Sequence, residues 1–156
     1  MNGGLYWSLI AFLAAGLAVA VVTDWRRREI PDWLNIAIAL GAIPFWAVSG
    51  VHLWPDVPIQ VALAAGVFAL FAGAFAIGQM GGGDVKLLGA LALWLPWHAL
   101  IQLLVIMSIA GGVLTLALVV PHRIAKQTAA LEIPYGIAIA FAGFWLIGER
   151  ILNQFV

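Results

Sequence analysis

The sequence predicts an all-helical integral membrane protein, a bundle of six transmembrane helices in a single domain over residues 1–156. Of its residues, 65% are hydrophobic and 9% are charged, and the mean hydropathy is +1.09. The apolar residues gather in uncharged runs close to the roughly 20 residues that a helix needs to cross hydrocarbon. A soluble core could not bury so much apolar surface. No hydrophilic linker divides the chain, so we expect one domain.

The composition also excludes several classes of function. The formal net charge is zero, so the chain has no basic field to attract nucleic acid. The absence of cysteine excludes disulfides, thiol catalysis and cysteine-ligated metals. The three histidines, His52, His98 and His122, have no metal-ligand spacing and fall on different faces of the predicted bundle. We therefore expect neither a metal nor a cofactor.

Three spans are predicted in the first half of the chain. Residues 5–23 carry no charge and form the first span. The preceding residues 1–4 lack a positive charge and the apolar run is long, so this segment is not a convincing cleavable signal peptide. The second span covers residues 33–51, with Pro31 at a favourable first helical position. A turn with two prolines separates it from the third span, residues 59–78.

Three further spans follow from the distribution of charge. No charged residue lies between Lys86 and Arg123, a distance that suits two spans better than one. We place them at residues 85–95 and 99–120, and the sixth span at residues 135–151. The fourth is too short to cross a membrane at about 1.5 Å per residue. It must begin within the preceding glycines, end beyond Trp97, or lie in a thinned bilayer.

The basic residues predict the orientation of the bundle. The loops after the first, third and fifth spans hold six of the seven: Arg26, Arg27, Arg28, Lys86, Arg123 and Lys126. By the positive-inside bias these loops are cytoplasmic, and both termini are periplasmic. Tryptophans are expected at both membrane interfaces, with Trp94 at the periplasmic one. This topology brings Asp24 and Asp84 to the cytoplasmic ends of their spans.

The segment of residues 80–86, Met-Gly-Gly-Gly-Asp-Val-Lys, is the strongest candidate for a site. A charge in hydrocarbon costs roughly 2.5 to 3.5 kcal/mol, and each glycine in a helix costs roughly 1 kcal/mol relative to alanine. Glycine lets another backbone approach closely, as a protease requires of an extended substrate. Helix packing through Gly78 and Gly82 is the alternative. The adjoining Asp84 favours a catalytic role.

Paired carboxylates are the chemistry that the composition leaves open. No serine lies in a Gly-x-Ser-x-Gly setting and no His-Glu-x-x-His is present. Two carboxyls can share one proton, one acting as base on water and the other as acid. Asp24 ends a helix and Asp84 begins one, so we expect Asp24 to hold the shared proton. Arg28, four residues on, could reverse this assignment.

Further residues near these motifs are also candidates for a role. Lys86 either tunes Asp84 or extends to the membrane interface. Asp32 is placed to complement the start of the second span. Pro134, Tyr135 and Gly136 open the sixth span, where they either line a substrate groove together with Pro31 or simply start a helix.

These motifs resemble those of the prepilin peptidases. The matching residues are Asp24 with the following Arg-Arg-Arg-Glu-Ile-Pro, the family's Gly-x-Gly-Asp-x-Lys at residues 81–86, and Ile-Pro-Tyr-Gly at residues 133–136. The resemblance implies an intramembrane aspartyl protease with Asp24 and Asp84 as its catalytic residues and Gly81, Gly83 and Lys86 as a supporting motif. It also implies cleavage of the basic leader of type IV pilin precursors on the cytoplasmic side of the bacterial inner membrane.

Departures from the family pattern narrow the resemblance. Larger members carry an additional cytoplasmic segment with cysteine pairs and also methylate the new N-terminus. This chain is similar to the small, cleavage-only type associated with Flp (tight-adherence) pili, which implies a prepilin substrate, membrane lipid as surroundings and no methyltransferase activity. Asp32 stands where many relatives have asparagine.

Two other classes of function use similar residues. A proton-coupled transporter or channel component also places acids near glycine breaks, but it favours acids at the middle of the bilayer and a repeat relating its halves. A non-catalytic scaffold for pilus assembly would leave both aspartates replaceable.

Overall fold

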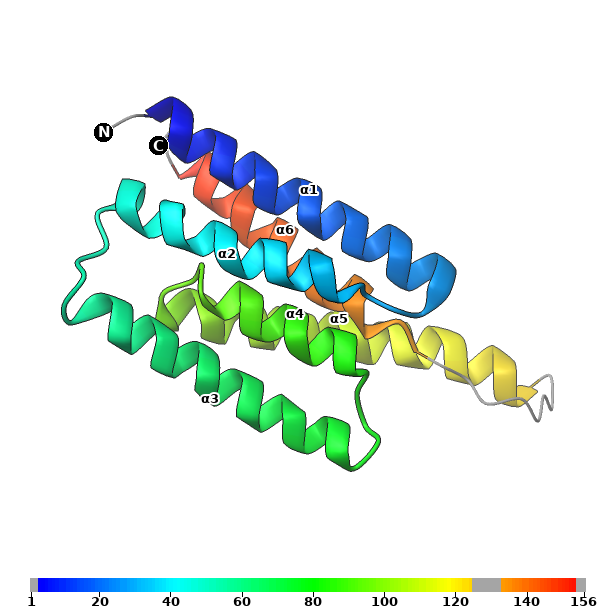
Figure 1. Ribbon diagram of the computed structural model, residues 1–156. Helices are drawn as coiled ribbons and strands as arrows, with labels where there is room; N and C mark the ends of the chain where they lie inside the picture. The colour runs from blue at the N-terminus through cyan, green and yellow to red at the C-terminus, as the bar shows by residue number, and fades with distance from the viewer. Residues whose placement is uncertain (1–2, 125–132, 154–156) are drawn as a thin grey trace.

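The protein folds into a bundle of six helices in which successive helices run in opposite directions (Figure 1). The computed structural model describes residues 3–124 and 133–153. The helices are α1 (Gly3–Arg27), α2 (Asp32–Ser49), α3 (Asp56–Ala76), α4 (Gly82–Ala92), α5 (Trp97–Ile124) and α6 (Tyr135–Leu152). The start of α1 and the end of α6 lie at the same end of the bundle (Figure 1). The all-helical class is confirmed.

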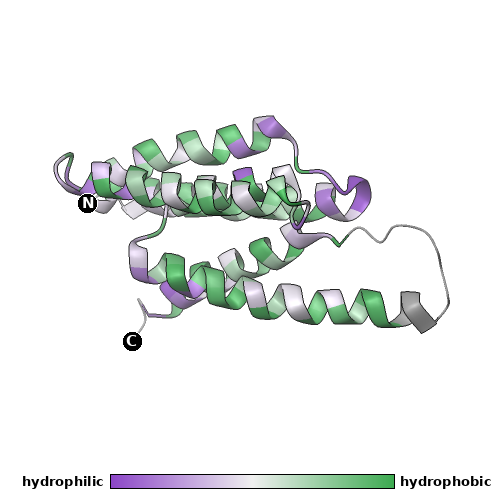
Figure 2. Ribbon diagram, turned by 90° about the horizontal axis from the view of Figure 1, so that it is seen from below, coloured by the Kyte–Doolittle hydropathy of each residue, from purple (hydrophilic) through white to green (hydrophobic). Residues whose placement is uncertain are grey.

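Five of the six helices in the described residues are long and apolar enough to cross a membrane, and α4 is the exception. Large apolar side chains face outward from these helices, for example Ile36, Leu70 and Ile109. Hydrophilic residues gather toward the ends of the bundle and hydrophobic ones along its length (Figure 2). Apolar surface of this extent suits lipid rather than water. The chain is therefore a multi-pass membrane protein.

The predicted boundaries hold to within a few residues at most helix ends. The helix α1 continues through Asp24 to Arg27, so this aspartate lies in its last turn. The helix α5 runs to Ile124, so residues 121–124 are helical although the sequence predicts a loop there. Lys126 and Glu132, from the same predicted loop, and the side chain of Arg123 lie outside the described residues.

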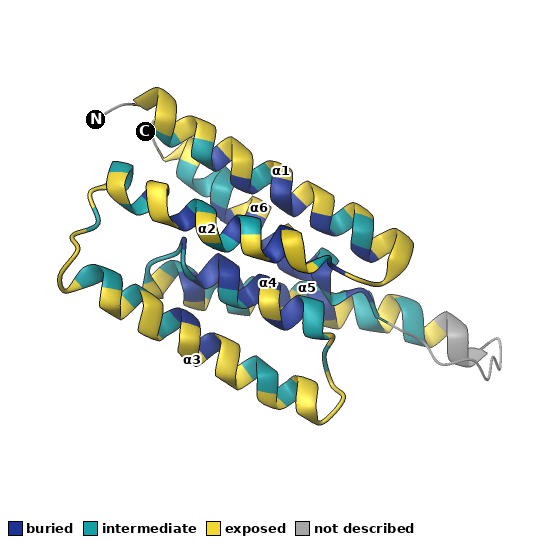
Figure 3. Ribbon diagram, in the orientation of Figure 1, coloured by how far each residue is buried: buried dark blue, intermediate teal, exposed yellow. Residues whose placement is uncertain are grey.

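The short helix α4 is the centre of the bundle. It begins inside the glycine segment, and it packs against α2, α3 and α6. Most of its residues are buried, whereas its neighbours expose their outer faces (Figure 3). Its 11 residues span about 16 Å. The long surrounding helices shield it, so α4 itself need not cross the full membrane.

Neighbouring side chains satisfy the carbonyl groups at the C-terminal end of α4. Gln60 Nε2 donates a hydrogen bond to the carbonyl oxygen of Ala92 at 2.6 Å and a second one to that of Leu95. Trp46 Nε1 donates to the carbonyl oxygen of Leu93 at 2.8 Å. A helix end leaves carbonyls without helical partners, and these are costly in a nonaqueous interior. These donors allow α4 to end inside the bundle.

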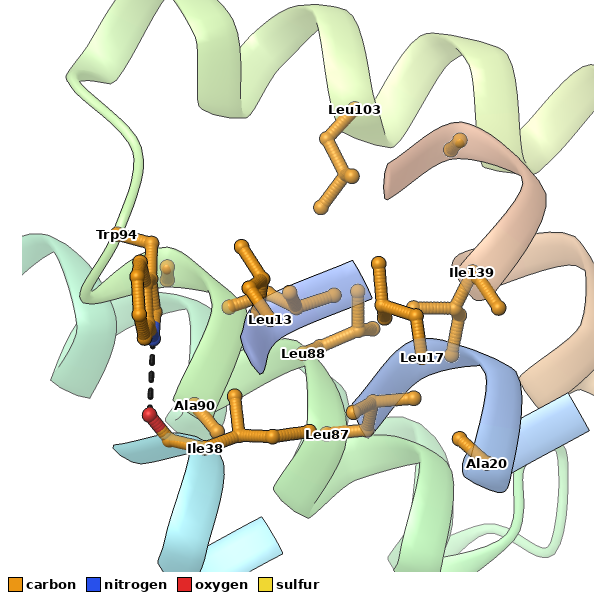
Figure 4. Close-up of a cluster of buried hydrophobic side chains, with 14 of the residues drawn as sticks. Leu13, Leu17, Ala20, Ile38, Leu87, Leu88, Ala90, Trp94, Leu103 and Ile139 are labelled. Carbon is orange, nitrogen blue, oxygen red and sulfur yellow. Dashed lines mark hydrogen bonds between the residues drawn. The ribbon is translucent and has the colours of Figure 1, made fainter. Parts of the chain in front are cut away.

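Trp94 belongs to the core and not to the membrane interface that the sequence predicts for it. It is 3% exposed, and its Nε1 donates to the carbonyl oxygen of Ile38 at 2.8 Å (Figure 4). Leu17, Leu87 and Leu88 are fully buried in the same cluster. A tryptophan can be buried when its N–H finds an acceptor, which the main chain of α2 supplies here.

Replacing Trp94 by phenylalanine is expected to lower the stability of the bundle by about 1 kcal/mol from the lost hydrogen bond, plus a cost for the smaller ring. Thermal unfolding in detergent measures this. Trp97→Phe is the matched control, because Trp97 is 62% exposed and its replacement should leave the transition unchanged. Equal losses for the two variants would contradict the role of the Trp94 hydrogen bond.

Candidate active site

Asp24 is buried where α1 meets the start of α6. It is 4% exposed, and the main-chain amides of Gly136 and Ile137 lie near its carboxylate. Its Oδ2 has no hydrogen-bond partner among the described residues. The prediction that Asp24 holds the shared proton rests only on its place at the C-terminal end of α1. Because the N-terminal end of α6 also faces this carboxylate, the assignment of the proton stays a prediction.

Asp84 lies in the first turn of α4 and is 7% exposed. Its carboxylate lies close to the main chain of the preceding Gly81. A Cβ atom on Gly81 would lie 2.9 Å from Asp84 Oδ2, closer than nonbonded atoms tolerate. Gly81 therefore gives the carboxylate the space that it occupies.

Asp24 and Asp84 line one cleft of about 500 Å³. Its other walls are Arg28, the turn of residues 78–81, Ile133 and Tyr135. The two carboxylates are close enough for their charges to interact. The volume lies in the usual range of ligand sites. The structure thus brings together two acids that are far apart in the sequence, as the topology predicts.

Tyr135 and Arg28 both contribute to the cleft wall. The ring of Tyr135 packs on α5, where a Cβ atom on Gly111 would lie 3.2 Å from it, and its hydroxyl is 3.5 Å from Thr115 Oγ1. Arg28 ends α1 with a φ of 55°, and its guanidinium lies 5.8 Å from the centre of the Trp25 ring. Both side chains are held by packing outside the cleft.

The remaining predicted groove residues do not line this cleft. Pro134 is buried, and Gly136 lies against Asp24. Pro31 precedes α2 and is not among the cleft residues. Of the four residues that the sequence suggests for a substrate groove, Tyr135 is the one that borders the cleft. In the described ranges, no group of three or more histidine, aspartate and glutamate side chains could hold a metal ion.

All three consecutive glycines of the segment have the protein's own atoms close by: Gly81 those of Asp84, and the other two those of neighbouring elements. A Cβ atom on Gly83 would lie 3.1 Å from Ile30 Cβ, and one on Gly82 would lie 3.3 Å from the Phe75 ring. Gly78 has a φ of 72° and no neighbour within 4 Å, so it forms a turn and does not pack. The predicted role of these glycines in admitting a substrate backbone remains open only at the cleft residues Gly78 and Gly81.

Lys86 points away from the cleft and pairs with Asp32. Its Nζ lies 2.6 Å from Asp32 Oδ1, and the two side chains are 46% and 67% exposed. Lys86 joins α4 to the start of α2 by this contact. Asp32 thus has a cationic partner.

Because the pair of Lys86 and Asp32 is exposed, Lys86→Met and Asp32→Asn are expected to change stability equally, by no more than about 1 kcal/mol. The rate of any reaction catalysed in the cleft should stay within about threefold of wild type for both variants, a factor worth less than 1 kcal/mol. A larger loss of activity for Lys86→Met alone would indicate that this lysine tunes Asp84.

Two residues at the site were missed by the sequence analysis. Asn35 is 4% exposed, and its Nδ2 donates to the carbonyl oxygen of Gly83 at 3.4 Å. Ile30 is 3% exposed and lies between the starts of α4 and α6. A signal existed for Asn35, since it is the one asparagine in the predicted second span. For Ile30 there was no such signal beyond its place in the motif that follows Asp24.

Comparisons with known proteins show the family of this chain. A family model described as the type IV leader peptidase family matches residues 11–116, a region that contains both aspartates. Similar curated proteins are prepilin leader peptidase/N-methyltransferases. The one from Dickeya chrysanthemi is 32% identical over 80% of this chain and 47% of its own length. Those from Aeromonas hydrophila and Burkholderia pseudomallei (strain K96243) are 29% and 30% identical, over 88% and 87% of this chain and 49% and 45% of their own lengths.

The chain spans about half the length of these relatives. No solved structure gives a significant match. The matched region is more than half of the chain. The protein therefore belongs to the type IV leader peptidase family.

Proposed function

We propose that this chain is an intramembrane aspartyl endopeptidase that removes the leader of Flp-like type IV prepilins, with Asp24 and Asp84 as its catalytic residues. The observation that carries the proposal is the cleft in which two buried carboxylates meet, in a member of a leader peptidase family. Burying two acids close together costs free energy, and such costly groups gather at functional sites.

The two carboxyls suit hydrolysis of a peptide bond. One carboxylate takes a proton from a water molecule, and the water oxygen attacks the scissile carbonyl carbon. The partner carboxyl gives its proton to the carbonyl oxygen, which forms a tetrahedral intermediate. The carboxyl that took the proton from water then gives it to the nitrogen as the C–N bond breaks, and the other carboxylate takes a proton from a hydroxyl of the intermediate. The products leave the pair sharing one proton, as at the start. Gly81, beside Asp84, and Tyr135 are positioned to contact the substrate backbone.

We further propose one domain in the bacterial inner membrane, with the cleft on the cytoplasmic side and both termini on the periplasmic side. The distribution of charge supports this orientation. Arg26, Arg27 and Arg28 follow Asp24 at the cleft end, and Lys86 follows Asp84. Arg150 lies at the other end, near the rings of Tyr6 and Phe45. Basic residues favour the cytoplasmic side.

Leader cleavage without methylation is the activity that we assign. This assignment follows from the resemblance to the small, cleavage-only type. The transporter alternative is less favoured because both acids lie at one end of the bundle, beside the turns that precede α2 and α4. A transporter site is expected near the middle of the spans.

Reconstituted protein tests the proposal. Purified enzyme in phospholipid vesicles is incubated with an Flp-type prepilin and S-adenosylmethionine, and the products are identified by mass spectrometry. We expect a mature pilin that has lost its leader and carries no methyl group. An uncleaved prepilin would contradict the proposed peptidase activity and favour a non-catalytic scaffold instead. Proton flux into the same vesicles, followed with a pH-sensitive dye, would favour the transporter.

A further inference from the structure

We propose that Ile30 is a positioning residue that sets the separation between Asp24 and Asp84. It does not line the cleft, so it acts through the main chain of the elements that carry the two acids. The proposal rests on the function proposed above and names the part of the fold on which the catalytic geometry depends.

Ile30 reaches the interior because of the way α1 ends. Arg28 adopts a left-handed conformation with a φ of 55°, and its N–H donates to the carbonyl oxygen of Asp24 at 2.9 Å. This conformation ends the helix and turns the chain back on itself. Of the residues between α1 and α2, Glu29 is exposed whereas Ile30 is 3% exposed. The loop therefore inserts one apolar side chain into the bundle.

The main chain of Ile30 lies directly on the start of α4. A Cβ atom on Gly83 would lie 3.1 Å from Ile30 Cβ, 3.2 Å from its nitrogen and 3.3 Å from its oxygen. Backbone meets backbone here, and the contact is immediately before Asp84 in sequence. Asn35 holds the same turn through the carbonyl oxygen of Gly83. The position of Asp84 therefore depends on where the Ile30 loop lies.

The tip of the Ile30 side chain lies on the start of α6. A Cβ atom on Gly136 would lie 2.8 Å from Ile30 Cδ1 and 2.7 Å from Asp24 Oδ2. The same glycine thus touches both the isoleucine tip and the first aspartate. Ile30 therefore lies between the start of α4, which carries Asp84, and the start of α6, which contacts Asp24. Packed interiors transmit small changes of volume to their neighbours.

The experiment shortens this side chain and measures kcat and KM for leader removal from a purified Flp-type prepilin. Ile30→Val removes Cδ1 alone, and Ile30→Ala removes all atoms beyond Cβ. We expect kcat to fall by about tenfold for valine and up to about a hundredfold for alanine, because catalysis is sensitive to displacements near 1 Å. KM should stay within about twofold, since Ile30 does not border the cleft.

Ile38 supplies the matched control. It is also a buried isoleucine, 0% exposed, and it packs against Gly16 of α1. Ile38→Val and Ile38→Ala make the same truncations in the core without touching either aspartate. All variants are assayed below their unfolding temperatures. We expect both Ile38 variants to keep the wild-type kcat, even where their unfolding temperatures fall as far as those of the Ile30 variants.

Two outcomes would overturn the proposal: a wild-type kcat for Ile30→Val and Ile30→Ala, or equal losses of kcat in the Ile38 variants. If Ile30→Ala does not fold, the valine variant decides. Asp24→Asn and Asp84→Asn are measured in the same assay. Normal cleavage by these variants would instead refute the proposed function, so the two failures can be told apart.

Discussion

Asp24→Asn and Asp84→Asn are each expected to lower leader removal by about 10²- to 10⁴-fold, the usual contribution of a general acid or base. Asparagine has nearly the same shape as aspartate but neither accepts a proton from water nor donates one as an acid. The variants should therefore insert and fold while a co-expressed prepilin stays uncleaved. Immunoblotting for the prepilin and for the enzyme in the membrane fraction measures both properties.

Asp56→Asn is the matched control for these substitutions. Asp56 begins α3 at the other end of the bundle, and its Oδ2 accepts a hydrogen bond from the His52 main-chain N–H at 3.1 Å. Its replacement removes a carboxylate of the same kind without approaching the cleft, so cleavage should continue at the wild-type rate. Normal processing by either cleft variant would refute the catalytic pair and favour the scaffold reading.

Gly136→Ala is expected to reduce kcat by about a hundredfold and to destabilise the bundle by about 1 to 3 kcal/mol. The added Cβ would lie 2.7 Å from Asp24 Oδ2 and 2.8 Å from Ile30 Cδ1, and both neighbours are buried. One of them must move, and moving either disturbs the aspartates. Steady-state kinetics with an Flp-type prepilin and thermal unfolding measure the two effects.

Gly148→Ala lies in the same helix and has no atom within 4 Å of the added Cβ. It should keep full activity and gain up to about 1 kcal/mol from the better helix propensity of alanine. In the double variant Gly136→Ala with Ile30→Val, one of the two clashes is removed. Stability should recover in part while kcat stays low. Wild-type kcat in Gly136→Ala would show that Asp24 has freedom to move without loss of chemistry.

The helices could be predicted from the sequence because hydrophobic length alone determines most of them. The runs that become α1, α3, α5 and α6 differ from their predicted spans by a few residues at each end. The short α4 posed the main difficulty, since length gave three solutions. In the structure α4 begins at Gly82 but ends at Ala92, so it stays short, and the contacts of Gln60 and Trp46 with its last carbonyls let it end inside the bundle. Such contacts between distant segments leave no local pattern.

The two aspartates could also be identified from the sequence, because carboxylates at the ends of apolar runs are costly and therefore few. Their neighbours could not. Lys86 turns to Asp32 rather than to the adjacent Asp84, a choice that depends on how α2 and α4 cross. Ile30 and Gly136 meet across the bundle through van der Waals contact alone. The burial of Trp94 could not be predicted either, because the group that accepts its hydrogen bond, the carbonyl oxygen of Ile38, belongs to another helix.

The burial of α4 has a consequence for how the cleft can move. This helix is packed on by α2, α3 and α6, and deeply packed segments exchange their amide hydrogens last. Asp84 therefore belongs to the most deeply buried helix of the bundle, and the amides of its interior residues Leu88 and Leu91 should be among the slowest to exchange. The turn of residues 78–81 is largely exposed and has fewer such constraints. Any widening of the cleft would come from that turn, with Asp84 as the fixed point.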